Sequence, residues 1–341
     1  MRWSSKAVII RREDGVGMKS KRSEIINALK ASEGKAISGE ELGKELGISR
    51  TMVCKYIKGL KDDGYEILAA PKKGYVLKSV PKLLYPDEIL AGLKTTLFGK
   101  NIIYYEEANS SNDIAKKIAA TAEEGTIIVV EQQTGGRGRL GRQWASPKGG
   151  IWFSIILKPR IALAKASRLT LTFGLSVVKT IRMFDIDAKI KWPNDVLIDG
   201  KKISGILTEV EAEIDTVDFV VIGIGINANM SLKDIPENLR ENSTTLRDET
   251  GKTIDRVEFL QKLLYEMEQD YIRFSTQPFS EIMDDIVTLS DTIGKDVTVT
   301  MPNRIVSGVV VGISKTGALL LKRNDGAVEE IIAGRCLYSK K

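Results

Sequence analysis

The sequence has 341 residues, of which 43% are hydrophobic, and a formal net charge of +6. It is long enough for two or three domains with buried cores. No apolar run approaches the roughly 20 residues that span a membrane, and the N-terminus lacks the apolar segment of a secretory signal. We therefore expect a cytoplasmic protein with no membrane partner. The absence of histidine and the wide separation of Cys54 and Cys336 exclude histidine-based catalysis and a disulfide framework.

The first 80 residues divide into a short leader and a segment with regular helix and strand signals. Residues 1–18 show no clear pattern, and we expect a loose leader. Residues 19–80 carry helical spacing of apolar residues, then a Ser38–Glu41 capping pair, a second N-cap at Ser49, and two strand-like runs. Two helices, a tight turn, a third helix and a hairpin predict a winged helix-turn-helix.

Basic and polar side chains gather where such a domain would touch a duplex. Residues 19–80 contain 13 Lys or Arg and 8 Asp or Glu. Their placement on the expected recognition helix and wing is typical of phosphate contacts. The alternative is a winged helix used for protein contacts, with the lysines solvated. The candidate DNA-binding residues are Arg50, Thr51, Lys55, Lys58, Lys72 and Lys73.

The rest of the chain predicts two further units and a mixed α+β fold. Residues 81–288 combine buried strand patterns, such as 125–133 and 218–227, with amphipathic helices. Residues 289–341 consist of short alternating strands with a turn at Asn324–Gly326, which predicts a small all-β module.

A glycine–arginine segment stands out in the central unit. Residues 135–147, "GGRGRLGRQWASP", contain four glycines and three arginines. Glycine lets backbone N–H groups approach a ligand closely, and arginine suits phosphate and carboxylate. The segment matches neither a Walker loop nor a dinucleotide fingerprint. A basic surface loop and an anion-binding loop that orders on its ligand remain equally open.

Three other motifs are candidate ligand contacts, and the first two have ordinary structural alternatives. Lys191, Asn194, Asp195 and Lys202 fall on a strand end and a hairpin, where a lysine could neutralise a phosphate but could equally be a solvated surface residue. Residues 109–113, "NSSND", could be simple helix N-caps. The glycines of "GIGIN", 223–227, indicate a ligand lying against a buried strand.

Taken together, these segments resemble the bifunctional biotin–protein ligase/biotin-operon repressor family over nearly all of residues 20–341. "GRGRLGRQW" resembles the adenylate loop of that family, and "KWPNDVLIDGKKISGIL" resembles its second signature. "GEELGKELGISRTMVCKYIKGL" is similar to its helix-turn-helix. The resemblance implies a mixed-sheet ligase domain at 81–288 and an SH3-like barrel at 289–341. One departure is Leu140, where the family often has another arginine, so the ordering of the loop could be weaker.

The resemblance also implies site residues. Lys202, Arg137 and Arg139 would be catalytic, and the family's Mg²⁺ would lie near Asp195. The biotin-binding set would be Ser110, Ser111, Asn112, Gln133, Arg137, Gly138, Arg139, Lys202 and Gly205. The adenylate or nucleotide set would be Gly136, Trp144, Asp195, Asn227, Gly223 and Gly225.

The implied activity is ATP-dependent formation of biotinyl-5′-AMP and transfer of biotin to a lysine of a biotin-acceptor domain of a carboxylase. Biotin, ATP and Mg²⁺ are the implied small molecules. Operator DNA and a homodimer formed on adenylate binding are the implied partners for a repressor role. Two alternatives stay open from the sequence: a ligand-sensing repressor without transferase activity, and a lipoate–protein ligase.

Overall fold

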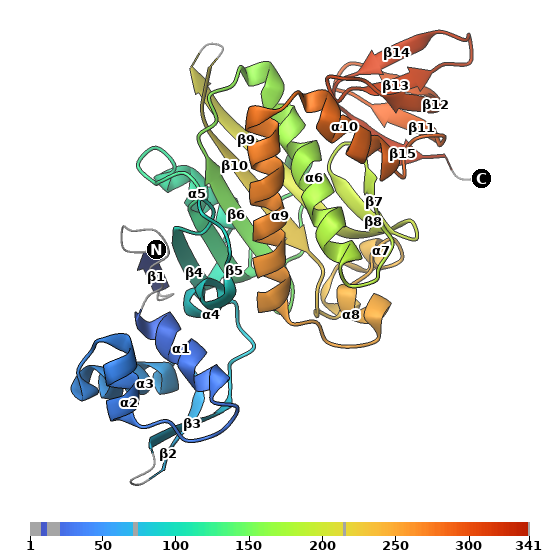
Figure 1. Cartoon of the computed structure of the whole chain (residues 1–341). Coiled ribbons are helices and arrows are strands. Elements are labelled where there is room, and N and C mark those ends of the chain that lie inside the picture. The colour runs from blue at the N-terminus through green and yellow to red at the C-terminus, as the bar shows by residue number, and fades with distance from the viewer. Residues whose placement is uncertain (1–7, 12–20, 71–73, 214–215, 340–341) are drawn as a thin grey trace.

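The computed structural model describes residues 8–11, 21–70, 74–213 and 216–339. An N-terminal helical unit, a central sheet covered by helices and a C-terminal β module follow one another along the chain (Figure 1). The fold is therefore mixed α+β, as predicted. Within the described ranges, no helix is long and apolar enough to cross a membrane.

The N-terminal unit is a winged helix-turn-helix, and local signals set its boundaries. The Ser38 hydroxyl accepts a hydrogen bond from the Glu41 N–H at 3.0 Å, and the Ser49 hydroxyl accepts one from the Met52 N–H at 3.2 Å. Gly47 ends the middle helix in the left-handed region, with φ 64°, which glycine adopts without strain. The elements are α1 (Lys21–Ala31), α2 (Gly39–Leu46), α3 (Arg50–Asp62), β2 (Glu66–Ala70) and β3 (Gly74–Ser79).

Eight strands form the central sheet in the order β1-β4-β5-β6-β10-β9-β8-β7. The β4/β5 pair is parallel, and the other neighbouring pairs are antiparallel. The strands are β1 (Val8–Arg11), β4 (Asn101–Ala108), β5 (Ile127–Gln133), β6 (Ile151–Leu157), β7 (Ala188–Lys191), β8 (Asp195–Ile198), β9 (Lys201–Glu213) and β10 (Thr216–Ile226).

Helices cover both faces of this sheet. Strand β5 shows the alternation, because Ile127 and Val129 pack into the large core cluster while Ile128 and Val130 pack into a second cluster around α5. The large cluster lies beneath α6 and α9, which run side by side over the sheet (Figure 1). The helices of this unit are α4 (Pro86–Gly92), α5 (Ser111–Ile118), α6 (Ala166–Arg182), α7 (Glu237–Arg240), α8 (Leu246–Thr250), α9 (Arg256–Thr276) and α10 (Phe279–Thr288).

Strand β1 corrects the expectation of a loose leader. It pairs antiparallel with β4, with Val8 opposite Tyr104 and Arg11 opposite Asn101. A four-residue strand offers too little periodicity to detect, and its order comes from backbone bonds to a strand far along the chain. The leader prediction was therefore wrong for residues 8–11.

The C-terminal module is a five-stranded antiparallel sheet in the order β14-β13-β12-β11-β15. Its inner face joins the core beneath α6 and α9 through Val297, Val310 and Leu319. The alternation in residues 289–341 predicted a small all-β module, but it did not single out the last strand, β15, which becomes important below. The strands are β11 (Asp296–Thr300), β12 (Ile305–Ile313), β13 (Leu319–Lys322), β14 (Val328–Ile331) and β15 (Arg335–Tyr338).

A buried ion pair fixes the segment that joins the winged helix to the sheet. Arg256, at the start of α9, pairs with Glu131 of β5 at 2.8 Å. Arg256 also donates to the backbone oxygens of Lys82 and Gly150, at 2.5 and 2.8 Å. Glu131 accepts the Leu84 N–H at 2.6 Å. The linker is thereby held to the strand that leads into the glycine–arginine segment.

Candidate active site

A cavity of about 300 Å³ opens beside the carboxyl ends of β4 and β5. Its walls come from the glycine–arginine loop, the β7–β9 hairpins, β10, the 239–243 segment and β15. Asp195 is the one acidic residue that lines it, as far as the described residues show. The cationic lining residues are Arg137, Arg139, Arg142, Lys191, Lys202 and Arg335. Such an excess of positive charge favours an anionic ligand.

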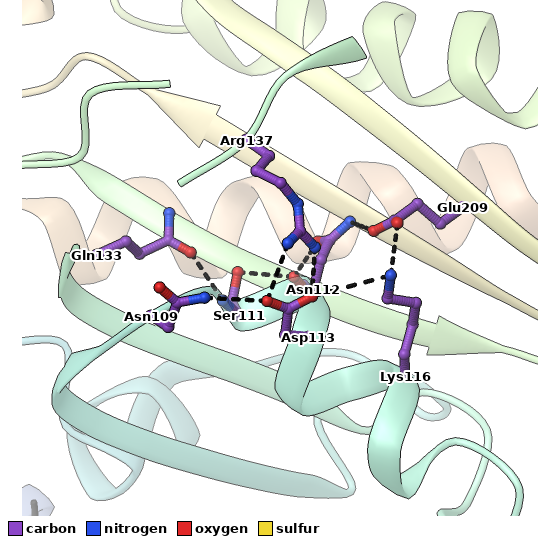
Figure 2. Close-up of polar contacts among 9 residues, drawn as sticks. Asn109, Ser111, Asn112, Asp113, Lys116, Gln133, Arg137 and Glu209 are labelled. Atoms are coloured by element: carbon purple, nitrogen blue, oxygen red, sulfur yellow. Dashed lines mark hydrogen bonds and ion pairs between the residues drawn. The ribbon is translucent and has the colours of Figure 1, made fainter. Parts of the chain in front are cut away.

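One end of the cavity is buried, polar and uncharged. Ser154 of β6 donates from one hydroxyl to either Ser111 Oγ, at 2.7 Å, or Asn112 Oδ1, at 2.5 Å. The Ser111 N–H donates to Gln133 Oε1 at 2.7 Å (Figure 2). Ser110 is at the N-cap position of α5, yet its side chain makes no capping bond in the described part of the chain. The simple capping interpretation of "NSSND" therefore fails for Ser110, whose hydroxyl remains available to a ligand.

Glycines let two side chains reach the floor of the cavity. A Cβ at Gly223 would lie 2.2 Å from Asn112 Oδ1, and one at Gly225 would lie 2.4 Å from the Trp144 indole nitrogen. Trp144 also packs edge-on to Trp152, with ring centroids 6.3 Å apart. Its indole N–H is buried and has no hydrogen-bond partner among the residues that the structure describes. An unsatisfied buried donor is unfavourable, so this N–H marks a place where a ligand acceptor would be stabilising.

Two cationic side chains reach the centre of the cavity, and they differ in whether a carboxylate neutralises them. Lys202 Nζ lies 2.6 Å from Asp195 Oδ1 and 4.8 Å from the centre of the Trp144 ring. Arg139 Nη1 donates to Asn194 Oδ1 at 3.0 Å, and no carboxylate among the described residues forms an ion pair with it. Burial lowers the pKa of the Arg139 guanidinium, and nearby Asp195 only partly offsets this. Arg139 is thus a desolvated cation that an incoming anion would stabilise.

Most of the predicted site residues line this one cavity. Gly136 and Asn227 do not. A Cβ at Gly136 would lie 2.4 Å from the Trp144 carbonyl, so this glycine permits the loop to fold. Asn227 is buried and donates to the Thr244 carbonyl at 3.1 Å, which fixes the wall behind Lys202. The predicted residues that line the cavity are Ser110, Ser111, Asn112, Gln133, Arg137, Gly138, Arg139, Trp144, Asp195, Lys202, Gly205, Gly223 and Gly225.

Some lining residues escaped the sequence reasoning. Asn242 and Ser243 belong to an irregular segment, while Gly334 directly precedes β15 of the C-terminal module and residues 335–337 belong to it. Burial raises the pKa of the Cys336 thiol to about 11, so Cys336 is an apolar part of the wall. The basic Arg335 beside it was the one local signal that could have drawn attention to this strand.

The candidate DNA-binding residues that the structure describes lie on α3, away from the cavity. Arg50, Thr51, Lys55 and Lys58 are all exposed on α3, while Val53, Ile57 and Leu60 of that helix point into the core. Lys72 and Lys73 lie outside the described residues. The exposed face of α3 is therefore free to meet a duplex.

Comparison with known families identifies the class of each part. Residues 106–227 match the biotin/lipoate A/B protein ligase family, residues 21–76 match an HTH domain, and residues 292–337 match the biotin protein ligase C terminal domain. The biotin protein ligase from Aquifex aeolicus in complex with biotin and ATP superposes with a TM-score of 0.63 at 34% identity, covering 70% of this chain and 99% of that chain. The fold is thus that of a biotin protein ligase with an added helix-turn-helix.

Relatives with the same combination of domains match this chain over nearly its whole length. The bifunctional ligase/repressor BirA of Bacillus subtilis (strain 168) is 40% identical over 89% of this chain and 95% of its own length. The corresponding protein of Escherichia coli (strain K12) is 29% identical over 87% of this chain and 91% of its own length. The chain belongs to the family of bifunctional biotin ligase/repressors.

Proposed function

We propose that this chain attaches biotin to a lysine of a biotin-acceptor domain in two steps. First, a carboxylate oxygen of biotin attacks the α-phosphorus of ATP, and pyrophosphate leaves. Then the uncharged lysine amine attacks the carbonyl carbon of the biotinyl-adenylate, loses a proton, and AMP leaves. The observation that carries the proposal is a cavity with six cationic residues beside a buried, uncharged polar end.

The two ends of the cavity suit the two ends of biotin. The ureido ring is polar and uncharged, and it matches the hydroxyl and amide groups of Ser110, Ser111, Asn112 and Gln133. The carboxylate would extend toward Lys202 and the glycine–arginine loop, where Arg139 would meet the α-phosphate. Positive charge fixed before the reaction stabilises the charge that develops on these oxygens.

The remaining candidates belong to the nucleotide side. Trp144 and the glycines 205, 223 and 225 would form a close-fitting floor, and the loop would keep water from the reactive adenylate. Magnesium would enter with ATP and be held chiefly by phosphate oxygens and water, because the described residues contain no group of three or more acidic or thiol side chains placed to bind a metal. Asp195 would add one carboxylate once Lys202 turns to the ligand.

The first step can be tested by pyrophosphate release. We expect release with ATP and biotin, and none with ATP and lipoate, because the buried polar end is matched to a ureido ring. Release with lipoate at a comparable rate would favour the lipoate ligase alternative. Absence of release with either acid, in protein that still binds biotin, would favour a sensor without transferase activity.

The second part of the proposal is a biotin-responsive repressor acting in the cytoplasm, where ATP and operator DNA are both present. A single winged helix reads few base pairs, so we propose that two copies bind a two-fold-symmetric operator. Beyond Ile206, whose N–H still donates to the Asn194 carbonyl, the described part of β9 pairs on one side only, with β10. This open edge could accept the same strand from a second copy.

Ligand dependence would arise because β9 also borders the cavity. Glu209 of β9 accepts a hydrogen bond from Asn112 at 2.8 Å (Figure 2). A ligand that binds the dimeric state more tightly shifts the population toward it. Gel shifts with and without biotin plus ATP test this part, and equal operator affinity in both conditions would contradict it.

A further inference from the structure

The glycine–arginine loop is fastened to α5 through one of its arginines. Arg137 Nη1 donates to Asp113 Oδ2 at 3.1 Å, and Arg137 Nη2 donates to Asp113 Oδ1, so the contact is bidentate (Figure 2). Asn109 Nδ2 also donates to Asp113 Oδ2, at 3.1 Å, and Lys116 Nζ lies 3.8 Å from Asp113 Oδ1. Asp113 does not line the cavity, and none of the motifs discussed above gives it a role.

The two loop arginines are therefore not equivalent. The chain itself neutralises Arg137, and the hydrogen bonds from its guanidinium to Asp113 raise the pKa of Arg137. Arg139 contacts the neutral amide of Asn194. Both arginines line the cavity, but Arg137 is paired with a carboxylate of the protein whereas Arg139 contacts a neutral amide.

Backbone contacts tie the same two segments together. The Thr134 N–H donates to the Ala108 carbonyl at 3.0 Å, and the Gly135 N–H donates to the Asn109 carbonyl at 2.8 Å. A Cβ at Gly135 would lie 2.1 Å from Asn109 Oδ1, so a larger residue here would displace the Asn109 amide that donates to Asp113. Further along, the Gly138 N–H donates to the Arg142 carbonyl at 2.7 Å, and the Trp144 N–H donates to the Gly136 carbonyl at 2.9 Å. These two amides report whether the loop is closed.

We propose that Asp113 is a positioning residue that holds the glycine–arginine loop over the cavity through the Arg137 side chain, leaving Arg139 to meet the anionic group of the ligand. This revises the role expected for the Arg137 guanidinium, and it rests on the proposed function only for the identity of the ligand. A loop that is already ordered loses less conformational entropy when the ligand binds.

The strength of this contact suits a loop that has to open. The side chains of Arg137 and Asp113 are 38% and 25% exposed, so solvent screens their attraction. A bidentate arginine–carboxylate contact is nevertheless stronger than a single exposed ion pair. We therefore expect loss of the contact to increase loop opening by roughly fivefold, the equivalent of a weak surface interaction.

Hydrogen exchange of the Gly138 and Trp144 amides in the ligand-free full chain tests the proposal. Asp113→Asn should speed exchange by about fivefold, and Arg137→Lys should do the same because lysine cannot form the bidentate contact. The double variant should be no faster than either single variant, since both remove one interaction. Asp113→Glu should restore part of the protection.

Glu209→Gln is the matched control, because it removes a carboxylate that accepts hydrogen bonds from Asn112 and Lys116 and that acts on Arg137 through its charge and not through a bidentate contact. Its exchange at Gly138 and Trp144 should equal that of the unsubstituted chain. Unchanged exchange in Asp113→Asn, or an equal increase in Glu209→Gln, would overturn the proposal.

A binding measurement adds a second readout. The dissociation constant of a non-hydrolysable biotinyl-adenylate analogue should rise in Asp113→Asn by no more than the factor by which exchange increases, because the ligand then has to close the loop itself. Arg139→Lys should weaken the analogue while leaving exchange unchanged. If the analogue fails to bind the unsubstituted chain, the proposed function fails, while the exchange result still decides the role of Asp113.

Discussion

Two arginine–carboxylate pairs act on opposite sides of strand β5, and they differ chiefly in burial. The side chains of Arg256 and Glu131 are 8% and 1% exposed, whereas those of Arg137 and Asp113 are 38% and 25% exposed. The buried pair fixes the linker from the winged helix, and both of its members also form hydrogen bonds with backbone groups. The exposed pair fixes a loop that must exchange ligands.

The difference shows that an arginine–carboxylate pair can hold one segment permanently when it is buried and another segment reversibly when it is partly exposed. Removing one member of a buried pair leaves an uncompensated charge away from water, which is strongly unfavourable. Removing one member of an exposed pair leaves a charge that water can solvate. We therefore expect linker contacts to persist while the loop opens and closes, and the following variants test this contrast.

The largest effect should come from the buried pair. Arg256→Met should lower the free energy of unfolding by about 3–5 kcal/mol, because Glu131 then stays buried without its partner. Chemical denaturation measures this. Lys262→Met is the control on the same helix, since the side chains of Lys262 and its partner Glu258 are 40% and 52% exposed. If Arg256→Met lowers the free energy of unfolding by less than about 1 kcal/mol, as expected for an exposed pair, the two pairs do not differ in the way proposed.

The cavity should show a large effect on rate with little effect on stability. Lys202→Ala should slow adenylate formation by about 100- to 1000-fold, the usual effect of removing one preorganised charge or donor, with the melting temperature nearly unchanged. Pyrophosphate release measures the rate. Lys148→Ala, which removes an exposed partner of Glu106, should leave the rate unaltered. A Lys202→Ala rate within a few-fold of the unsubstituted chain would exclude the proposed role.

On the winged helix, the effect should depend on salt. Lys55→Ala and Lys58→Ala should each reduce the slope of log operator affinity against log salt by about one, as expected for a lost phosphate contact. Gel shifts over a salt series give these slopes. Lys94→Ala, an exposed lysine of the ligase domain, should leave the slope unaltered, and slopes unaltered in all three variants would argue for the protein-contact alternative.

The smallest effect should be an opening of the loop in acid. Burial alone would raise the pKa of the Asp113 carboxyl, but hydrogen bonds and charge from Arg137, with Asn109 and Lys116, hold the pKa below its ordinary value of 3.8. The contact is therefore fully present above that value and is lost as the pH falls through the lowered pKa. Trp144 fluorescence should change over this acidic range in the unsubstituted chain. Asp113→Asn should lack this component, and identical pH profiles would contradict the assignment.

Local patterns predicted much of the fold and most of the candidate site. The caps at Ser38 and Ser49 and the turn at Gly47 depend on neighbouring residues, so the winged helix could be predicted in detail. The loop and the hairpin around Lys202 are also continuous stretches with a recognisable composition. The prediction that the loop and the hairpin meet in one cavity came from the family resemblance and not from the spacing of residues.

The features that the sequence concealed depend on distant partners. Glu131 and Arg256 are 125 positions apart, and neither is remarkable in its own segment. Asp113 looks like an ordinary acidic residue in the first turn of a helix until the loop brings Arg137 to it. Strand β15 contributes to the cavity only because the C-terminal module packs beside β7 and β8, which no local pattern records.

The most direct measurement of the central proposal is the mass of a purified biotin-acceptor domain after incubation with this chain, ATP and biotin. We predict the addition of one biotinyl group to one lysine of the acceptor, and loss of that addition when Lys202→Ala replaces the unsubstituted chain. An acceptor of unchanged mass, from a reaction in which the folded chain binds biotin and ATP is present, would contradict the assignment of the cavity as a biotin ligase site.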